Sequence, residues 1–236
     1  IPDEIRPTVW KILMGYLPTN ADRRKMALES KRTEYAEYID QSEFNEGIDR
    51  LDQQIYHQIH IDVQRTNASL LLYQQEKVRA ALERILYCWA IRHPASGYVQ
   101  GINDLVTPFF QVFLRDYFSE DVDIENIPES QIPDNVLFEV EADSFWCLSK
   151  LLDGIQDHYT HAQPGIQRQV VRLKELIRRI DIKLYDKLQD EGVEFIQFAF
   201  RWMNCLLMRE VSLKNTIRMW DSYQAEGSDG FSEFHL

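Results

Sequence analysis

The sequence predicts an all-α protein, and three observations support this fold class. Apolar residues recur at helical spacing in several stretches, no stretch sustains the alternating pattern of a strand, and helix-breaking residues separate the periodic segments. The chain has 236 residues, of which 44% are hydrophobic, so it can bury one large core or two smaller ones. We therefore expect roughly nine or ten helices.

Four helices can be placed directly from their apolar spacing. The clearest pattern comprises Leu82, Ile85, Leu86 and Trp89. Three later patterns comprise Leu148, Leu151, Leu152 and Ile155; Val170, Leu173, Ile177 and Ile180; and Leu213, Ile217 and Trp220. Because Pro94 disfavours helical geometry in the residue before it, the first of these helices should end at Arg92 or His93.

A fifth predicted helix is apolar on almost every side. Nearly all residues from Phe195 to Met208 are apolar, which indicates a helix buried nearly all round. Its polar residues Gln197, Arg201 and Asn204 are spaced so that they share one face. Two interpretations stay open: a satisfied internal hydrogen-bond network, or a stripe that supports a functional groove from behind.

The loops between the helices are marked by turn-forming residues. Breaks are expected at 18–20, 45–47, 94–97, 127–134 and 164–165. The segment 116–143 contains ten acidic residues and neither Lys nor Arg. We expect it to be a solvated, partly flexible loop, with recognition of a partner as the alternative.

Composition excludes several classes of function. With 26 basic and 38 acidic residues, the net charge is −12, which argues against nucleic-acid binding and against adsorption to anionic membranes. No apolar run approaches the length of a transmembrane helix, so any membrane association should be at most peripheral. The three cysteines are far apart and odd in number, which favours a reducing, cytoplasmic setting over a disulfide framework.

Common cofactor and metal motifs are missing from the sequence. It contains no phosphate-binding G-x-x-x-x-G-K-[ST] loop and no G-x-G-x-x-G fingerprint. The pairs His57/His60 and His158/His161 lack the further ligands that a metal site needs. We therefore expect the chain to bind no cofactor or metal of its own.

Arg65 is the first candidate functional residue. Ile59 and Ile61 anchor its segment in the core, and the helical pattern stops at 66–67, so Arg65 lies where a long side chain can project. Asp62, three residues earlier, is close enough to brace the guanidinium. The alternative is an ordinary surface ion pair between these two residues.

Gln100 is the second candidate. Gly97 and Gly101 flank it, so the backbone can bend sharply and approach a ligand closely. Tyr98 is large enough to wedge the loop in place, and Asp104 could cap the next helix or accept hydrogen bonds from loop amides. The alternative is a plain glycine-enabled connection between two helices.

An arginine and a glutamine together have the chemistry that accelerates GTP hydrolysis. The planar cation meets charge on the transferring phosphoryl group, and the neutral amide orients the attacking water.

The two segments also resemble a known family, the TBC domain, which activates Rab GTPases. The first family fingerprint, I-x-x-D-x-x-R, matches Ile59, Asp62 and Arg65. The second, Y-x-Q-G-x-x-D, matches Tyr98, Gln100, Gly101 and Asp104. The opening Ile1, Pro2, Arg6, Val9 and Trp10 and the later blocks at 201–202 and 217–221 are similar to other family landmarks, in the same order. The run 93–104 looks most like the Golgi-associated branch.

The resemblance implies a fold and a domain extent. It predicts a multi-helix TBC-type domain over 1–236, made of two helical subdomains with a groove that carries the catalytic residues. The family domain usually continues for several helices after the W-D block, so we expect the C-terminal helices to be truncated. Because the chain begins at Ile1, we also expect it to be a fragment of a longer protein.

The resemblance also implies a function and a mechanism. The domain would not be an enzyme itself but would complete the active site of a GTP-bound Rab GTPase in trans, with GTP and Mg²⁺ held by that partner. Arg65 and Gln100 would act as an arginine finger and a glutamine finger. The residues expected to support them are Asp62, Tyr98, Gly101, Asp104 and Arg201. The expected location is cytoplasmic and peripheral to Golgi membranes. The alternatives are a catalytically silent Rab-binding adaptor and a helical scaffold in which the fingerprints only pack.

Overall fold

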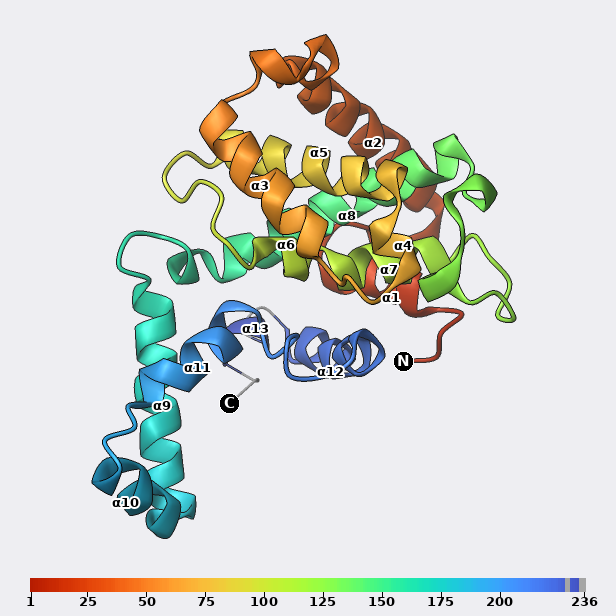
Figure 1. Cartoon of the computed structure of the whole chain (residues 1–236). Helices are drawn as coiled ribbons and strands as arrows, with labels where there is room; N and C mark the ends of the chain where they lie inside the picture. Colours follow the sequence, from red (N-terminus) through yellow and green to blue (C-terminus); the bar gives the residue numbers. More distant parts are fainter. Residues whose placement is uncertain (228–229, 234–236) are drawn as a thin grey trace. The chain divides into compact units, whose positions relative to one another are not determined.

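The computed structural model of the chain describes residues 1–227 and 230–233, and within those residues the regular structure is entirely helical (Figure 1). The all-α prediction is therefore confirmed. The chain divides into two compact units, Ile1–Leu151 and Leu152–Leu236.

The first unit contains both fingerprint segments. Its α-helices are α1 (Arg6–Leu13), α2 (Arg24–Gln41), α3 (Gln53–Arg65), α4 (Leu71–Gln74), α5 (Glu76–Arg92), α6 (Ile102–Leu105), α7 (Thr107–Arg115) and most of α8 (Asp134–Gly154). Short 3₁₀ turns connect them: η1 (Ala21–Arg23), η2 (Phe44–Glu46), η3 (Ile48–Arg50), η4 (Ile124–Asn126) and η5 (Glu129–Gln131).

Helix α5 forms the centre of the first core. Its four predicted apolar residues are almost entirely buried, and α3 packs along it (Figure 1). The helix ends at Arg92, as the following Pro94 predicts. Since α3 carries Arg65 and the loop after α5 carries Gln100, the packing of these two helices brings the two fingerprint segments together.

Helix α7 anchors the other side of the fingerprint loop. Phe109, Phe110 and Phe113 are fully buried, and Phe109 meets Trp10 of α1 edge to face, with ring centroids 5.8 Å apart. The hydroxyl of Tyr73 donates a 2.9 Å hydrogen bond to the carbonyl of Thr107, at the start of α7. The loop that precedes α7 is thus attached to a rigid base.

The acidic segment 116–143 departs from its prediction. It folds into two short turns and the first half of α8, and the side chains of Glu141 and Asp143 are completely buried. The expectation of a solvated loop is therefore wrong for the second half of the segment, because composition alone does not show which residues from elsewhere in the chain neutralise its charges.

The neutralising groups come from three other helices. Asp143 accepts hydrogen bonds from Arg32 Nε at 3.0 Å and Nη2 at 2.9 Å, and pairs with Lys11 at 2.7 Å. Glu141 accepts hydrogen bonds from Arg84 Nε at 2.8 Å and Nη2 at 2.7 Å. A buried carboxylate is tolerated only when it is paired and hydrogen-bonded in this way.

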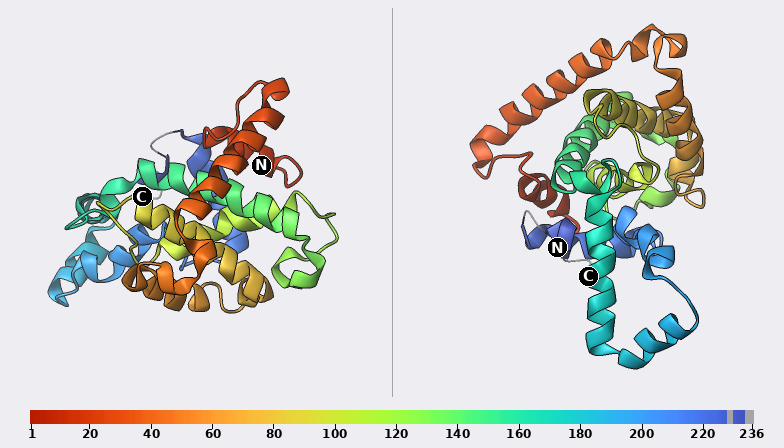
Figure 2. Two further views of the ribbon diagram at one scale, coloured as in Figure 1. Left: turned by 90° about the horizontal axis from the view of Figure 1, so that it is seen from above. Right: turned by 90° about the vertical axis from the view of Figure 1, so that its left-hand side faces the viewer.

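The second unit is built around one long helix, against which two shorter helices pack. Its described elements are η6 (Gln156–His158), α9 (Pro164–Ile180), α10 (Ile182–Asp190), α11 (Phe195–Asn204), α12 (Leu213–Ala225) and α13 (Gly230–Glu233). Figure 2 shows α9 as a long rod with α10 turning back from its end. Its core includes Ile166, Val170, Leu173, Phe195, Ala199 and Met203, which come from α9 and α11.

Helix α11 differs from the predicted helix over 195–208. It ends at Asn204, and Leu206 and Leu207 then adopt left-handed backbone angles, with φ of 48° and 63°. An α-helix of L-residues cannot continue through that geometry. Ile196 and Phe200 are each 37% exposed, so the expectation of a helix buried nearly all round is wrong. Only the face of α11 that meets α9 is covered in the unit's core.

Candidate functional site

Arg65 is the last residue of α3. The helix begins after Asp52, whose side chain accepts hydrogen bonds from the amides of Gln54 at 3.0 Å and Ile55 at 3.1 Å. Ile59 is completely buried and holds the helix against the core. The side chain of Arg65 is 64% exposed, because the helix stops there and leaves the guanidinium beyond its end.

The predicted contact between Arg65 and Asp62 is present. Nη2 of Arg65 lies 3.1 Å from Oδ1 of Asp62, and Nε of Arg65 donates to the carbonyl of Ile61 at 3.3 Å. Asp62 is only 3% exposed, so this is not an ordinary surface ion pair. A buried carboxylate makes a firmer anchor for the cation than an exposed one, because water competes with it less.

Gln100 lies on the loop between α5 and α6 and is exposed. Two glycines shape that loop: Gly97 has φ of 61° and Gly101 has φ of 110°. Both angles lie in the region that only glycine adopts without strain. The prediction that the glycines bend this loop sharply is confirmed.

Asp62 contacts both Arg65 and Gln100. Its Oδ1 atom lies 3.1 Å from Nη2 of Arg65 and 3.5 Å from Nε2 of Gln100. Its Oδ2 atom accepts hydrogen bonds from the hydroxyl of Tyr98 at 2.9 Å and from Nε2 of Gln58 at 3.2 Å. One buried carboxylate therefore contacts an exposed cation and an exposed amide that are 35 positions apart in the chain.

Tyr98 connects the glutamine loop to α3. Burial, together with the negative charge of Asp62 and the hydrogen bond to it, raises the pKa of Tyr98 far above its ordinary value. The hydroxyl therefore keeps its proton and stays a donor to Asp62 across the physiological pH range.

Asp104 does not occupy the capping position. Helix α6 begins at Ile102 with Gly101 as its N-cap, and Asp104 is the third residue of the helix. It is the side chain of Asn103 that accepts the loop amide of Gly101, at 3.0 Å. Asp104 Oδ1 lies 3.4 Å from Nδ2 of Asn103, so it borders the loop without capping the helix.

Asn103 and Thr66 are site residues that sequence reasoning missed. Asn103 Nδ2 donates to Thr66 Oγ1 at 2.9 Å, and the Thr66 hydroxyl donates to the carbonyl of Asp62, also at 2.9 Å. Asn103 is 4% exposed and Thr66 is 1% exposed. The one available signal was a polar residue that directly follows an apolar one at the start of a short buried helix.

Arg201 lies in the second unit, on α11. Its Nε donates to Oε1 of Glu210 at 2.7 Å, and its side chain is 57% exposed. It braces the segment that follows α11, and its predicted support of the fingers stays a prediction.

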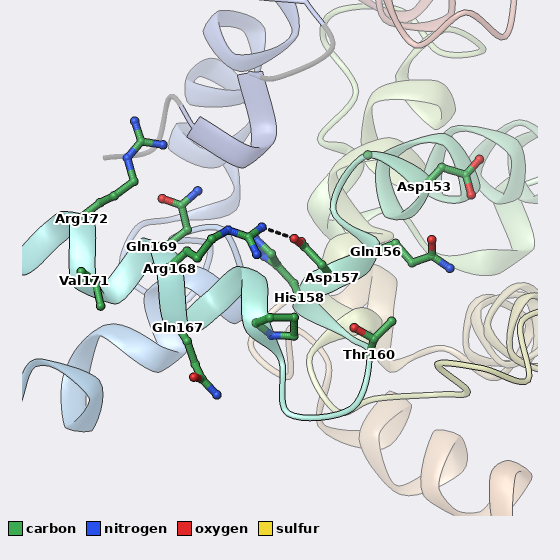
Figure 3. A pocket seen from close by; sticks show the side chains of 12 residues that line it. Asp153, Gln156, Asp157, His158, Thr160, Gln167, Arg168, Gln169, Val171 and Arg172 are labelled. Atoms are coloured by element: carbon green, nitrogen blue, oxygen red, sulfur yellow. Dashed lines mark hydrogen bonds and ion pairs between the residues drawn. The ribbon is translucent and has the colours of Figure 1, made fainter.

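A separate hollow of about 1000 Å³ lies in the second unit, around the start of α9 (Figure 3). Asp157 and Arg168 pair within it, and the neighbouring His158 is 1% exposed. Because charges of both signs line this hollow, and Asp157 and Arg168 already pair with each other, it shows no preference for a ligand class. The candidate functional site is therefore the group around Asp62.

The described residues also bear on two other kinds of site. No helix among them is long and apolar enough to cross a membrane. They also contain no group of three or more His, Cys, Asp or Glu side chains placed to hold a metal ion.

Comparison with known proteins agrees with the fingerprints. The Rab-GTPase-TBC domain model matches residues 3–236. The chain is 60% identical to the GTPase-activating protein gyp1 of Schizosaccharomyces pombe and 56% identical to TBC1 domain family member 22B of Homo sapiens, in each case over 100% of this chain and 46% of the relative. It is similar to the crystal structure of the Ypt/Rab-GAP domain of Gyp1p, with a TM-score of 0.93 and 53% identity over 100% of this chain and 73% of that one.

The chain therefore belongs to the Rab-GTPase-TBC domain family. It spans about half the length of the curated relatives it matches.

Proposed function

We propose that this chain is a GTPase-activating domain that accelerates GTP hydrolysis by a Rab-family GTPase in trans. The observation that carries the proposal is the contact of Arg65 and Gln100 with a single buried carboxylate, Asp62, while both finger side chains stay exposed. Family membership supports the partner class, since a relative with 60% identity is named a GTPase-activating protein.

Arg65 supplies the cation in this mechanism. Its guanidinium enters the nucleotide site of the GTPase and neutralises charge that develops on the β- and γ-phosphate oxygens. Since Asp62 holds the guanidinium before the partner arrives, little reorganisation is needed when that charge forms. An arginine supplied in this way is worth about 10³ to 10⁵ in rate.

Gln100 supplies the neutral group. Its amide can accept a hydrogen bond from the attacking water and donate one to a phosphoryl oxygen, which places the water in line for attack. In this proposal it takes the position of the partner's own glutamine. The GTPase holds GTP and Mg²⁺ and performs the bond cleavage, and this chain completes its active site.

The cellular setting is part of the proposal. We place the domain in the cytoplasm, peripheral to Golgi membranes, where it meets the GTP-bound Rab. The similarity of the run 93–104 to the Golgi-associated branch of the family supports this location.

The test is single-turnover GTP hydrolysis by a panel of GTP-loaded Rab GTPases. We expect the wild-type domain to stimulate at least one Rab, and Arg65→Ala to lower that stimulation by about 10³-fold or more. Arg65→Lys should also fail to restore the rate, because an ammonium group lacks the planar fork of a guanidinium. Gln100→Ala should lower the rate by about 10²-fold or more, as loss of a preorganised polar group in the transition state does.

Arg168 offers a matched control. Its side chain is 65% exposed and pairs with an aspartate, much as Arg65 is 64% exposed and pairs with Asp62. Arg168→Ala should keep the wild-type rate. If Arg65→Ala stimulates the best Rab as well as wild type does, the finger assignment is wrong. If the wild type binds GTP-loaded Rab but stimulates none, the adaptor alternative holds instead.

A further inference from the structure

We propose that the hydrogen bond between Thr66 and Asn103, here called the Thr66–Asn103 link, positions the two fingers relative to each other. The inference rests on the proposed function, because it assigns a role within the same site. Neither residue touches the nucleotide in this proposal, so both are positioning residues and not catalytic ones.

The link is a hydrogen bond between two side chains, and it joins the two chain segments directly beside the fingers. Thr66 immediately follows Arg65, and its hydroxyl accepts from Asn103 Nδ2 at 2.9 Å. Gly101 immediately follows Gln100, and its amide donates to Asn103 Oδ1 at 3.0 Å. The side chain of Asn103 therefore hydrogen-bonds both to the backbone amide of Gly101 and to the hydroxyl of Thr66.

The direction of the link and of the hydrogen bond from Gly101 to Asn103 is fixed by chemistry. The Thr66 hydroxyl has one proton, which goes to the carbonyl of Asp62 at 2.9 Å, so toward Asn103 it can only accept. Asn103 must then turn its nitrogen to Thr66 and its oxygen to Gly101. An amide has a donor on one side and an acceptor on the other, so Asn103 fits these two neighbours in one orientation only.

Burial makes the link rigid. Because Thr66 is 1% exposed and Asn103 is 4% exposed, water cannot replace either partner at low cost. Asp62 contacts both finger side chains near their tips, and the Thr66–Asn103 link joins the same two segments through the side chains of neighbouring residues. These two connections lie at different distances from the finger tips. Together they restrict rotation of one segment against the other, whereas a single connection would allow it.

The kinetic consequence differs from that of losing a finger. When the link is lost, Arg65 and Gln100 remain present and the docking surface is unchanged, but their spacing becomes variable. Misplacement of a catalytic group by about 1 Å can cost up to about 100-fold in rate. We therefore expect a lower kcat for stimulated hydrolysis, with the domain concentration that gives half-maximal stimulation nearly unchanged.

The decisive variant is Thr66→Val, which replaces the hydroxyl by a methyl group of similar shape. It should lower kcat by about 10- to 100-fold on the best Rab of the panel. Thr66→Ser keeps the hydroxyl and should retain most of the wild-type kcat. Asn103→Ala removes the link together with the hydrogen bonds that Asn103 Oδ1 accepts from Gly101 and Tyr98, and it should lower kcat at least as much as Thr66→Val.

Thr107→Val is the matched control. Thr107 is also a fully buried threonine, and its hydroxyl bonds Asn67 at 3.0 Å and the carbonyl of Asp104 at 2.9 Å. It joins the same two regions of the chain but is not adjacent to either finger. We expect it to lower thermal stability about as much as Thr66→Val while kcat stays at the wild-type level. An equal loss of kcat in Thr107→Val would overturn the inference, since any softening of this region would then suffice.

A partner-free measurement separates this inference from the proposed function. Hydrogen exchange of the Gly101 amide, followed by NMR on the isolated chain, reports whether Asn103 still holds that amide. Exchange should be at least about tenfold faster in Thr66→Val than in wild type, Thr66→Ser and Thr107→Val. If the wild type stimulates no Rab, the proposed function fails and the exchange rates still decide the link. The inference is refuted if exchange of the Gly101 amide is unchanged in Thr66→Val. It is also refuted if the wild type is active and Thr66→Val has the same kcat.

Discussion

A carboxylate offers only acceptors, and this property explains the residue type at position 62. Its two oxygens face donors from Arg65, Gln100, Tyr98 and Gln58. An ionised carboxylate has about four lone-pair sites, so all of these donors can be accepted at once. No neutral side chain of the same size can do this. Asp62 therefore stabilises the loop contact between α3 and Tyr98 as well as the two fingers.

Asp62→Asn should consequently lower both stability and GTPase stimulation by more than the loss of one charge would. The new amide has a single oxygen, and its NH₂ group would face donors that it cannot bond. We expect the free energy of unfolding of the first unit to fall by about 1 to 3 kcal/mol, the cost of unsatisfied buried groups. GTPase stimulation should fall by about tenfold or more, because Arg65 and Gln100 lose their common anchor.

Chemical denaturation and single-turnover hydrolysis measure the two effects. Asp157→Asn is the matched control, since Asp157 pairs with Arg168 but its side chain is 42% exposed. That change should alter stability by no more than about 0.5 kcal/mol. Wild-type activity in Asp62→Asn would show that the shared carboxylate is not needed to hold the fingers.

The site was predictable where its chemistry is local. Arg65 and Asp62 lie three residues apart on one helix, and Gln100 lies between two glycines, so spacing predicts their contact and the bend in the loop. The assignment of Arg65 and Gln100 as fingers rests on the family resemblance and stays a proposal. The role of Asn103 was not predictable in this way. Its partner Thr66 lies 37 positions earlier, and only the packing of the helices brings the two together.

At the scale of elements, α8 shows that tertiary contacts can bury acidic residues whose local sequence pattern predicts a solvated loop. Burial by itself would raise the pKa of Asp143, but hydrogen bonds from Arg32 and the charge of Lys11 outweigh it, so the pKa lies below its ordinary value. The carboxylate is therefore ionised at neutral pH and ties α8 to α1 and α2. Amphipathic helices such as α5 were predictable, because their burial follows from their own periodicity. The burial of an acidic helix such as α8 depends instead on cations from distant parts of the sequence.

Removal of this buried anion should be costly. Asp143→Ala leaves Lys11 and Arg32 without their shared partner, and we expect the first unit to lose about 3 to 5 kcal/mol of stability. Denaturant unfolding, followed by tryptophan fluorescence, measures the loss. Glu139→Ala is the control, because its side chain is 31% exposed in its pair with Arg32, and it should cost about 1 kcal/mol or less. Similar losses of stability in Asp143→Ala and Glu139→Ala would mean that burial does not determine how much each ion pair contributes.

At the scale of the whole molecule, the chain divides into two compact units, and we expect the second to have its own response to acid. The second unit contains His158, which is 1% exposed and donates to the backbone of Met203, while its Nδ1 atom has no hydrogen-bond partner among the described residues. Burial lowers the pKa of His158 below its ordinary value. The nearby Asp157 raises that pKa and Arg168 lowers it, and these two charges pair with each other.

The sign of the pH effect follows from this shift. Because the unfolded state binds a proton near pH 6.5 and the folded state binds it only at lower pH, the contribution of neutral His158 to the stability of the second unit is fully present above about pH 6.5 and is lost as the pH falls below it. Hydrogen exchange, corrected for its intrinsic pH dependence, should therefore show α9 and α11 losing protection between pH 7.5 and pH 5.5 relative to α5. His158→Gln should weaken this loss, since a glutamine does not ionise, whereas the exposed His161→Gln should leave it as in wild type. If His158→Gln keeps the full pH dependence, another group is responsible, and the neutral buried imidazole does not limit the acid stability of this unit.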